Sequence, residues 1–501
     1  MGFLPCIHTM RPHVTPINSA LPARCLGSLV LAGALISGCA TPNNAPEPET
    51  TTTLTQTIYS DDGVSEVSVP ADWTVRPDFG RDAALRVAED SGKAFLLLNT
   101  YQPGEIPDTT AADFSRSYAQ GLVHSLPNST ARDEVILEIN GAPAHRHVVS
   151  GDVGNIRLTY VSTVMQGDTA LHHLIAWTAA SDYQRNGDVL DEVISSFRES
   201  QTQREPRQRI GLSFDWPDSL QSAANFRKTS VRRGKKSELK ATYLTTVSPG
   251  GDNELYVRTR VMSHNTHTGQ SAAGDLTRSL ARHLTAEVPD YVVSRDGEFI
   301  RIVNLPAYQQ RVETALVSSL PPDETGQKEK ILALLQPGLT EQYLAAAATN
   351  EWNKTVGGWV GSSYVPGQTY RFNETYYSPP LGDTPFVMNV SRQVPGFTHC
   401  NSANPDCVQL LQTARVDGAD FRSAMRRFLE NALGKEVRLK EISVVKNMEV
   451  IAEPGTLIPH RIRASEETTV VIEDAAGNLH TSRDVEETHI TYNYESYTAS
   501  R

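Results

Sequence analysis

Four histidines lie close together in the sequence between residues 145 and 173. His145 and His147 alternate within "AHRHVVSG", and His172 and His173 are adjacent in "ALHHLIAWTAA". Because side chains alternate along a strand, the first two share a face, whereas the second two point to opposite faces. If the strands are adjacent, His145, His147 and His172 can converge on one metal ion. Solvated or hydrogen-bonded histidines on a half-exposed sheet are the favoured alternative, since no acid or cysteine is paired with them.

A basic stretch, "RKTSVRRGKKSELK", runs from Arg227 to Lys240 in a chain whose net charge is -12. A loop with that charge can contact phosphate groups on lipids or lipopolysaccharide, or an acidic partner, with each cation contributing about 1 kcal/mol near an anionic surface. A solvated hairpin loop is the alternative, and the more common one. The candidate contacts are Arg227, Lys228, Arg232, Arg233, Lys235 and Lys236.

Catalytic motifs are missing from the sequence. GxSxG, HExxH, GxGxxG and P-loop patterns do not occur. Ser237 and Lys240 have the SxxK spacing of penicillin-interacting serine enzymes, which need both groups on the first turn of a helix. Here "ELKATYLTTVS" predicts a strand, which separates the two groups. We therefore predict no catalytic residue, no enzyme and no cofactor.

The N-terminus predicts an exported protein with a lipid anchor. An apolar stretch from Leu26 to Ile36 follows Arg11 and Arg24, and it is too short to span a membrane. It ends in "ISGC", which resembles the bacterial lipobox, and this resemblance implies that residues 1–38 are removed and that Cys39 is lipidated. The following Ala40 suggests sorting to the outer membrane of a Gram-negative bacterium, facing the periplasm. Residues 39–57, rich in proline and threonine, predict a flexible tether.

Two cysteines remain in the predicted folded part. Cys6 and Cys25 leave with the leader, and Cys39 carries the lipid. An even pair in an oxidising compartment, Cys400 and Cys407, predicts a disulfide that closes the loop "HCNSANPDC". The alternative is a metal site that also uses His399, which a single cysteine spacing supports only weakly.

Length and charge bound the class of protein. The chain has 501 residues, enough for several domains. Its acidic balance argues against nucleic acid as the main partner. Beyond the leader, no apolar stretch is long enough to cross a bilayer. These features predict soluble domains held at a membrane by the lipid.

An internal repeat predicts tandem modules. Helical segments begin at Ala112, Gly274 and Ala419, each with an acidic residue followed by apolar residues at every fourth position. "VSVPADW", which ends at Trp73, is matched by "GLSFDW", which ends at Trp216. The expected modules are residues 58–200, a divergent copy at 208–356, and the weakest copy at 358–501, which contains the Cys400–Cys407 loop.

The first module shows its fold most clearly. After its helix come β-branched and aromatic runs separated by turn residues, which predict an antiparallel meander, and a closing helix with Val189, Val193 and Phe197 on one face. "VSVPADW", "INGAPAHRH", "YVSTVM", "HLIAWTAASDY" and "VLDEVISSF" make residues 58–200 similar to the PsbP-like family. The expected fold class is therefore α+β, with two or three PsbP-like antiparallel-sheet sandwiches in tandem and flanking helices.

The resemblance implies a binding or assembly role more often than an enzyme. We expect a non-enzymatic scaffold, accessory or binding factor of the cell envelope, with the membrane contacted through the lipid anchor and an envelope protein as partner. Two alternatives remain open. One is a metal-binding protein or hydrolase that uses the histidine cluster, and the other is a carrier for lipid or glycan.

Overall fold

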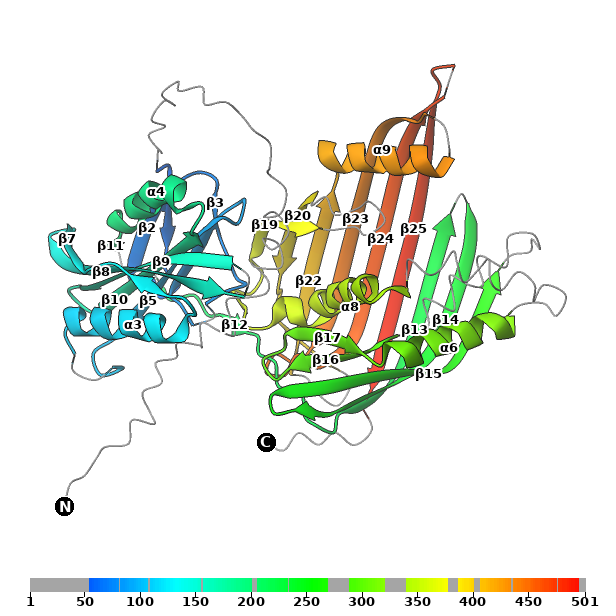
Figure 1. Cartoon of the computed structure of the whole chain (residues 1–501), viewed down its shortest axis with the longest axis horizontal. Helices are drawn as coiled ribbons and strands as arrows, with labels where there is room; N and C mark the ends of the chain where they lie inside the picture. The colour runs from blue at the N-terminus through cyan, green and yellow to red at the C-terminus, as the bar shows by residue number, and fades with distance from the viewer. Residues whose placement is uncertain are drawn as a thin grey trace. The chain divides into compact units, whose positions relative to one another are not determined.

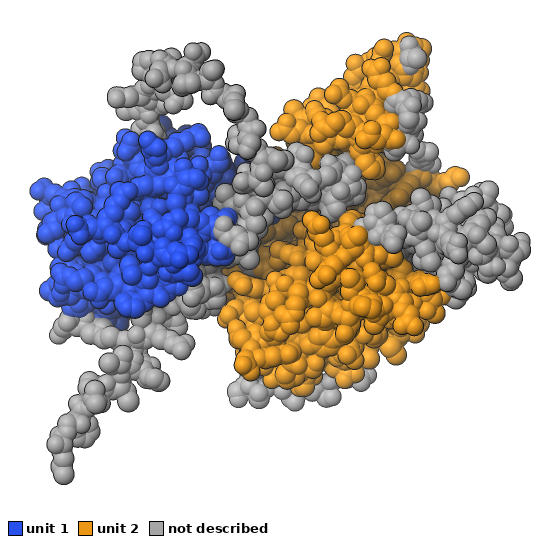
Figure 2. All heavy atoms as spheres, viewed as in Figure 1, with its two compact units in different colours: residues 1–209, 372–374 blue, residues 210–371, 375–501 orange. Residues whose placement is uncertain are grey.

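The structure is a computed structural model that describes residues 54–80, 82–106, 109–154, 156–200, 205–232, 234–268, 288–319, 339–376, 386–400, 406–433, 436–474 and 476–494. The chain divides into two compact units (Figure 2). Unit 1 comprises residues 1–209 with 372–374, and unit 2 comprises residues 210–371 with 375–501. The predicted leader, Cys39 and most of the tether lie outside the described residues.

Unit 1 is built on an antiparallel sheet of eight strands in the order β3-β4-β5-β10-β9-β8-β6, with β7 paired to β8. The strands are β3 (Trp73–Val75), β4 (Leu85–Glu89), β5 (Ala94–Tyr101), β6 (Thr130–Ala131), β7 (Val135–Ile139), β8 (Ala142–Val153), β9 (Ile156–Gln166) and β10 (Leu171–Ala179). A second sheet joins β1 (Gln56–Tyr59), β2 (Ser65–Val69) and β11 (Arg198–Glu199). The predicted meander is confirmed as β8, β9 and β10.

Both faces of the eight-stranded sheet are covered. Helix α3 (Ala111–Ser125) packs on one face, where Leu122 meets Val149, Ile175 and Trp177. Helix α4 (Tyr183–Ser195) covers the other face, on which Leu174 and Ala176 contact its apolar side (Figure 1). A strand with helices on both sides needs an apolar side chain at almost every position, and every residue of β10 is buried.

Unit 2 contains one antiparallel sheet of twelve strands, in the order β17-β16-β15-β14-β13-β25-β24-β23-β22-β20-β19, with β21 paired to β22. Its first half is β13 (Gln221–Arg232), β14 (Lys235–Gly251), β15 (Glu254–Thr268), β16 (Asp290–Ser294) and β17 (Phe299–Val303). Its second half is β19 (Thr369–Tyr376), β20 (Phe386–Gln393), β21 (Phe397–Thr398), β22 (Cys407–Val416), β23 (Arg438–Ala452), β24 (Pro459–Glu473) and β25 (Leu479–Asn493). A two-stranded sheet pairs β12 (Ile210–Gly211) with β18 (Ser363–Tyr364).

The two halves of this sheet come from the segments predicted as separate modules, 208–356 and 358–501. They join where β13 pairs with β25 along nine residue pairs, from Ala223–Asn493 to Val231–Val485. The predicted boundary between these modules therefore separates two halves of one sheet rather than two sheets. The physical reason is that each half exposes an unpaired strand edge, which backbone hydrogen bonding to the other half satisfies.

Three helices pack against one face of the large sheet. Helices α6 (Leu305–Ser319) and α8 (Glu341–Thr355) cover β16 and β17, with Tyr308 and Leu344 in the contact, and the short η5 (Gly357–Trp359) follows α8. Helix α9 (Ala419–Leu433) packs over β22 and β23, where Phe421 contacts Val416. All three lie on the same side of the strands (Figure 1). The opposite face carries alternating polar side chains, as expected for an antiparallel sheet with one face in water.

The helix predictions of the repeat are confirmed at α3 and α9, whereas the segment expected to form a helix from Gly274 lies largely outside the described residues. The strand pairing around these two helices differs. In unit 1, β10 lies beside β5, so the last strand is inserted next to the strand that precedes the helix. In unit 2, β23 follows α9 and pairs directly with β22. The two regions therefore share a helix between strands along the chain, whereas the order of strands in their sheets differs.

Candidate functional site

A groove of about 510 Å³ lies on the polar face of the unit 2 sheet. Four adjacent strands build it in two rows of paired residues. One row is Thr491, Asn225, Thr242 and Ser263, on β25, β13, β14 and β15 in that order. The second row, on the same strands, is His489, Arg227, Lys240 and Asn265. We call these eight residues the sheet groove.

Strand alternation explains why these side chains share a face. In "ANFRK", Asn225 and Arg227 point to the groove, while Phe226 points to the helix-covered face, where it packs with Tyr243 and Ile490. The strand β25 repeats this pattern, since its residues from 487 to 493 alternate between exposed and half-buried. The polar residues of each strand therefore meet at the groove once the strands are in register.

The groove carries an excess of cationic groups. Arg227 donates a hydrogen bond to Glu238, and Lys240 Nζ lies 3.6 Å from the second oxygen of that carboxylate. Partial desolvation raises the pKa of Glu238, but the hydrogen bond from Arg227 and the two positive charges outweigh it and lower the pKa overall. Two cations thus share one ionised carboxylate, and His489 lies beside them.

Chemically, the sheet groove presents amide, hydroxyl, guanidinium and ammonium groups at short spacing. Guanidinium and ammonium donors form their strongest hydrogen bonds with carboxylate and phosphate oxygens. Amide and hydroxyl side chains both donate and accept hydrogen bonds, so they pair with sugar hydroxyls. Seven of its eight side chains are exposed, and Thr242 is half-buried. The arrangement is suited to binding a polar, anionic chain.

The predicted basic stretch forms the hairpin of β13 and β14, which turns at Gly234 with a φ of 73°. Its cations are distributed over both faces. Arg227 reaches the groove, whereas Lys228 lies on the opposite face, 2.8 Å from Glu486, which Arg232 also contacts. Lys235 and Lys236 are exposed at the hairpin end, and Arg233 lies outside the described residues. The six candidate contacts therefore do not form one cluster.

The predicted histidine site requires a correction. Strand β9 separates β8, which carries His145 and His147, from β10, which carries His172. His172 points to the α4 side, where its ring lies 4.9 Å from that of Phe197. His173, not His172, shares the α3 side with His145 and His147. Among the described residues, the groups close enough to hold a metal include none of these histidines.

On the α3 side, His145 and His173 have local hydrogen-bond partners instead, and His147 is buried. His145 Nδ1 lies 2.7 Å from Glu134 Oε1. Burial lowers the pKa of His147, and its Nε2 is among the buried atoms with no hydrogen-bond partner. His173 Nε2 lies 2.8 Å from the Ser162 hydroxyl, and burial lowers the pKa of His173 to about 3. For His145 and His173 the result is the favoured alternative of hydrogen-bonded histidines, although on a buried sheet rather than a half-exposed one.

His172 forms a buried pair with Glu199 on the α4 side. The His172 ring is fully buried, and its Nε2 lies 2.8 Å from Glu199 Oε1. The same carboxylate accepts hydrogen bonds from the backbone of Asp168 and Thr169, in the turn between β9 and β10. Burial raises the pKa of Glu199, but the hydrogen bonds from His172 and this turn lower it overall. The pair therefore fixes β11 to the turn between β9 and β10.

The predicted disulfide between Cys400 and Cys407 is present. Thr398, at the end of β21, pairs with Cys407, at the start of β22, so the bond closes the loop between these strands. The third group near the sulfurs is His460 of β24, not His399. The sequence gives no signal for His460, since 53 positions separate it from Cys407. Ser237 and Lys240 lie on β14, which confirms the predicted strand and leaves the SxxK spacing without its helix.

No family model matches the chain, and no curated protein matches it. Among the described helices, none has the length and apolar character to cross a membrane.

Several solved structures resemble a segment of the chain. They include cyanobacterial PsbP (CyanoP) from Synechocystis sp. PCC 6803, at 14% identity, covering 32% of this chain and 100% of that one with a TM-score of 0.25. LpqN, involved in cell envelope biogenesis of Mycobacterium tuberculosis, has 14% identity, covers 29% of this chain and 90% of its own, and gives a TM-score of 0.24. A Pseudomonas aeruginosa protein of unknown function, a putative regulator, has 12% identity, covers 27% and 92% of the two chains, and scores 0.20. At these scores the likenesses carry no argument about function.

Proposed function

We propose that the chain is a lipid-anchored, non-enzymatic binding or accessory factor of the cell envelope, and that the sheet groove of unit 2 binds its ligand. The observation that carries this proposal is the register of β25, β13, β14 and β15, which brings eight polar or basic side chains together on one exposed face. The ligand that matches them is an anionic glycan of the envelope, with phosphate or carboxylate groups for Arg227 and Lys240 and hydroxyls for the amides.

A lipid carrier needs an apolar cavity for an acyl chain, whereas the groove is lined mainly by polar side chains. The groove therefore favours the glycan over the lipid. We keep the predicted location, at the outer membrane and facing the periplasm, because it rests on the lipobox "ISGC" and on Ala40. The tether of residues 39–57 then sets how far the groove reaches from the membrane.

For unit 1 we retain the PsbP-like assignment of residues 58–200 as part of the proposal. The assignment is supported by the positions of its sequence motifs on the strands and helices of unit 1. "VSVPADW" ends at β3, "HLIAWTA" forms most of β10, and "VLDEVIS" forms the end of α4. In this proposal unit 1 serves as the assembly module and unit 2 binds the ligand.

The test of ligand binding uses the full mature protein in detergent, with immobilised lipopolysaccharide and immobilised peptidoglycan fragments as separate probes. Reversing two charges, R227E with K240E, is expected to weaken binding by about tenfold or more, since two charge-assisted contacts become repulsive. The matched control is R426E with R427E, which changes the net charge equally on exposed positions of α9. Equal losses in both variants, or no binding of either probe by the wild type, would refute the glycan proposal.

The test of the anchor is separate. Replacing the lipidated thiol, C39A, is expected to abolish incorporation of radiolabelled palmitate and to stop processing of the leader. Palmitate incorporation that persists in C39A would show that the lipid is attached elsewhere.

A further inference from the structure

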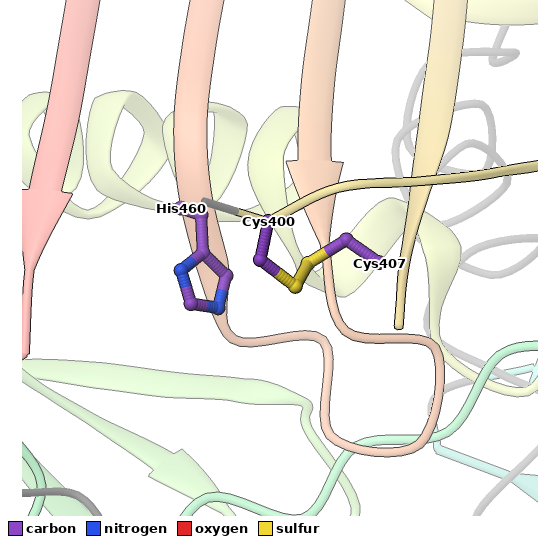
Figure 3. A group of neighbouring side chains, drawn as sticks. All are labelled: Cys400, Cys407 and His460. Carbon is purple, nitrogen blue, oxygen red and sulfur yellow. A yellow bond between two sulfur atoms is a disulfide. The ribbon is translucent and has the colours of Figure 1, made fainter. Parts of the chain in front are cut away.

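Two sulfur atoms and an imidazole meet at one end of the unit 2 sheet. The ligand atoms of Cys400, Cys407 and His460 all lie within 4.8 Å of one another, and His460 faces the disulfide from a different strand (Figure 3). Two cysteine sulfurs and one imidazole nitrogen are three of the four ligands of a common tetrahedral zinc site. The bond between the two sulfurs would have to be reduced before they could bind a metal ion.

The sheet itself holds these three groups together. Thr398 pairs with Cys407, which fixes one end of the disulfide loop. Val408, next to Cys407, pairs with Ala452 of β23, and Ala452 pairs with Pro459, next to His460. The imidazole is therefore placed by backbone hydrogen bonds across three neighbouring strands, so its position does not depend on the disulfide.

The surroundings are largely buried and include a carboxylate group. Cys407 is fully buried, and the His460 side chain is 10% exposed, with the Tyr494 ring 5.3 Å from its own. Glu453 Oε1 lies 3.0 Å from His460 Nε2. A carboxylate hydrogen-bonded to an imidazole orients the ring as a metal ligand and favours the binding of a cation.

We propose that this group is a redox-gated metal site, closed as a disulfide when oxidised and able to bind a zinc-class divalent cation when reduced. A dithiol reductant donates two electrons and two protons, the S–S bond breaks, and Cys400 and Cys407 become thiols while the reductant forms its own disulfide. Metal binding then releases the two thiol protons, so that two thiolates and one imidazole nitrogen hold the ion. Water completes four ligands, and Glu453 holds the imidazole by its hydrogen bond. This inference is independent of the sheet groove and its ligand.

Cobalt is the probe, because tetrahedral cobalt–thiolate sites have a strong charge-transfer absorption. The full mature protein in detergent is reduced with a phosphine and then titrated with Co²⁺. The phosphine takes the oxygen of one water molecule to become phosphine oxide, and the two protons of that water go to the two thiols. We expect one equivalent of bound cobalt with thiolate absorption in the reduced protein, and none in the oxidised protein. A reduced protein that keeps its circular dichroism and shows no thiolate absorption overturns the proposal.

Two histidine variants separate this site from the one predicted around His399. His460→Ala is expected to weaken cobalt binding by roughly tenfold or more, whereas His399→Ala leaves it unchanged. The opposite result overturns the proposal. A second measurement covers the case in which His460→Ala folds poorly when reduced. Zinc should slow alkylation of both thiols in the wild type and in His399→Ala, and equal alkylation rates with and without zinc in these two proteins also overturn the proposal.

Discussion

Strands β10 and β25 show how differently the two units use an antiparallel sheet. All nine residues of β10 are buried between α3 and α4. In β25 the last seven residues alternate between exposed and half-buried, because the described helices of unit 2 that pack on the sheet cover one face only. A sheet covered on both sides must satisfy its polar groups internally, whereas a sheet with one open face can present them to a ligand.

The histidines of the two strands illustrate this difference. His173 is fully buried, bonded to Ser162 and surrounded by the rings of Phe114 and Tyr118. His489 is exposed and lines the sheet groove beside Arg227. The same residue type is therefore packed in the interior of unit 1 and exposed for binding in unit 2. Adjacent histidines in a sequence are weak evidence for a site until their burial is known.

The largest expected effect on stability is in β10, the strand covered by helices on both faces. Leu174→Ala in β10 removes a fully buried side chain and should lower the free energy of unfolding of unit 1 by about 2–5 kcal/mol. The measurement is urea unfolding followed by hydrogen-exchange mass spectrometry, which monitors each unit separately. Loss of protection confined to unit 2 would contradict the division into two compact units.

The disulfide should distinguish the units by redox state. Outside the predicted leader and anchor, the only cysteines are Cys400 and Cys407, both in unit 2. Opening a loop of about eight residues should lower the free energy of unfolding of unit 2 by about 2.5 kcal/mol on the chain-entropy estimate. Adding a reductant during the urea experiment measures it, with Cys400→Ser/Cys407→Ser as the control that reductant should not affect. If reduction also lowered the free energy of unfolding of unit 1, the disulfide would not act on unit 2 alone.

Acid should act on unit 1 through His173. Its folded-state pKa is lowered to about 3 from 6.5, so the unfolded chain binds the proton more readily, and stability falls as pH drops from about 6.5 towards 3. The loss amounts to about 2 kcal/mol at pH 5. His173→Gln removes the titrating group and should flatten this pH dependence, as measured by urea unfolding between pH 7 and pH 5. An unchanged slope in the variant would show that His173 is not the acid-sensitive group.

The smallest effect on stability is expected at the open face. Thr491→Ala removes an exposed hydroxyl from the groove and should change the free energy of unfolding by less than about 0.5 kcal/mol. The same variant should weaken binding of the glycan probe by a few fold, since about one neutral hydrogen bond is lost. Thr481→Ala, exposed on the same strand and outside the groove, is the matched control. A loss of stability at position 491 without a loss of binding would make the groove a structural feature only.

Much of unit 1 could be predicted because its signals are local. The apolar run from Ala94 to Leu98, the apolar periodicity of α3 and the turn residues between β8, β9 and β10 each depend on neighbouring residues. The disulfide was also predictable, because only two cysteines remain outside the predicted leader and anchor, which leaves one pairing. The choice of His172 over His173 was wrong because a sequence reveals alternation along a strand but not which face packs against which helix.

The sequence by itself determined the alternation of each strand, the positions of helices α3, α4 and α9, the cysteine pair and the predicted export signal. These follow from residue type and short-range periodicity. Only the tertiary structure decided that β13 pairs with β25, although Asn225 and its partner Thr491 lie 266 positions apart in the sequence. That pairing forms the sheet groove, and the run of β22, β23 and β24 brings His460 to the cysteines. Both depend on long-range strand register, which backbone hydrogen bonds fix and which no local pattern encodes.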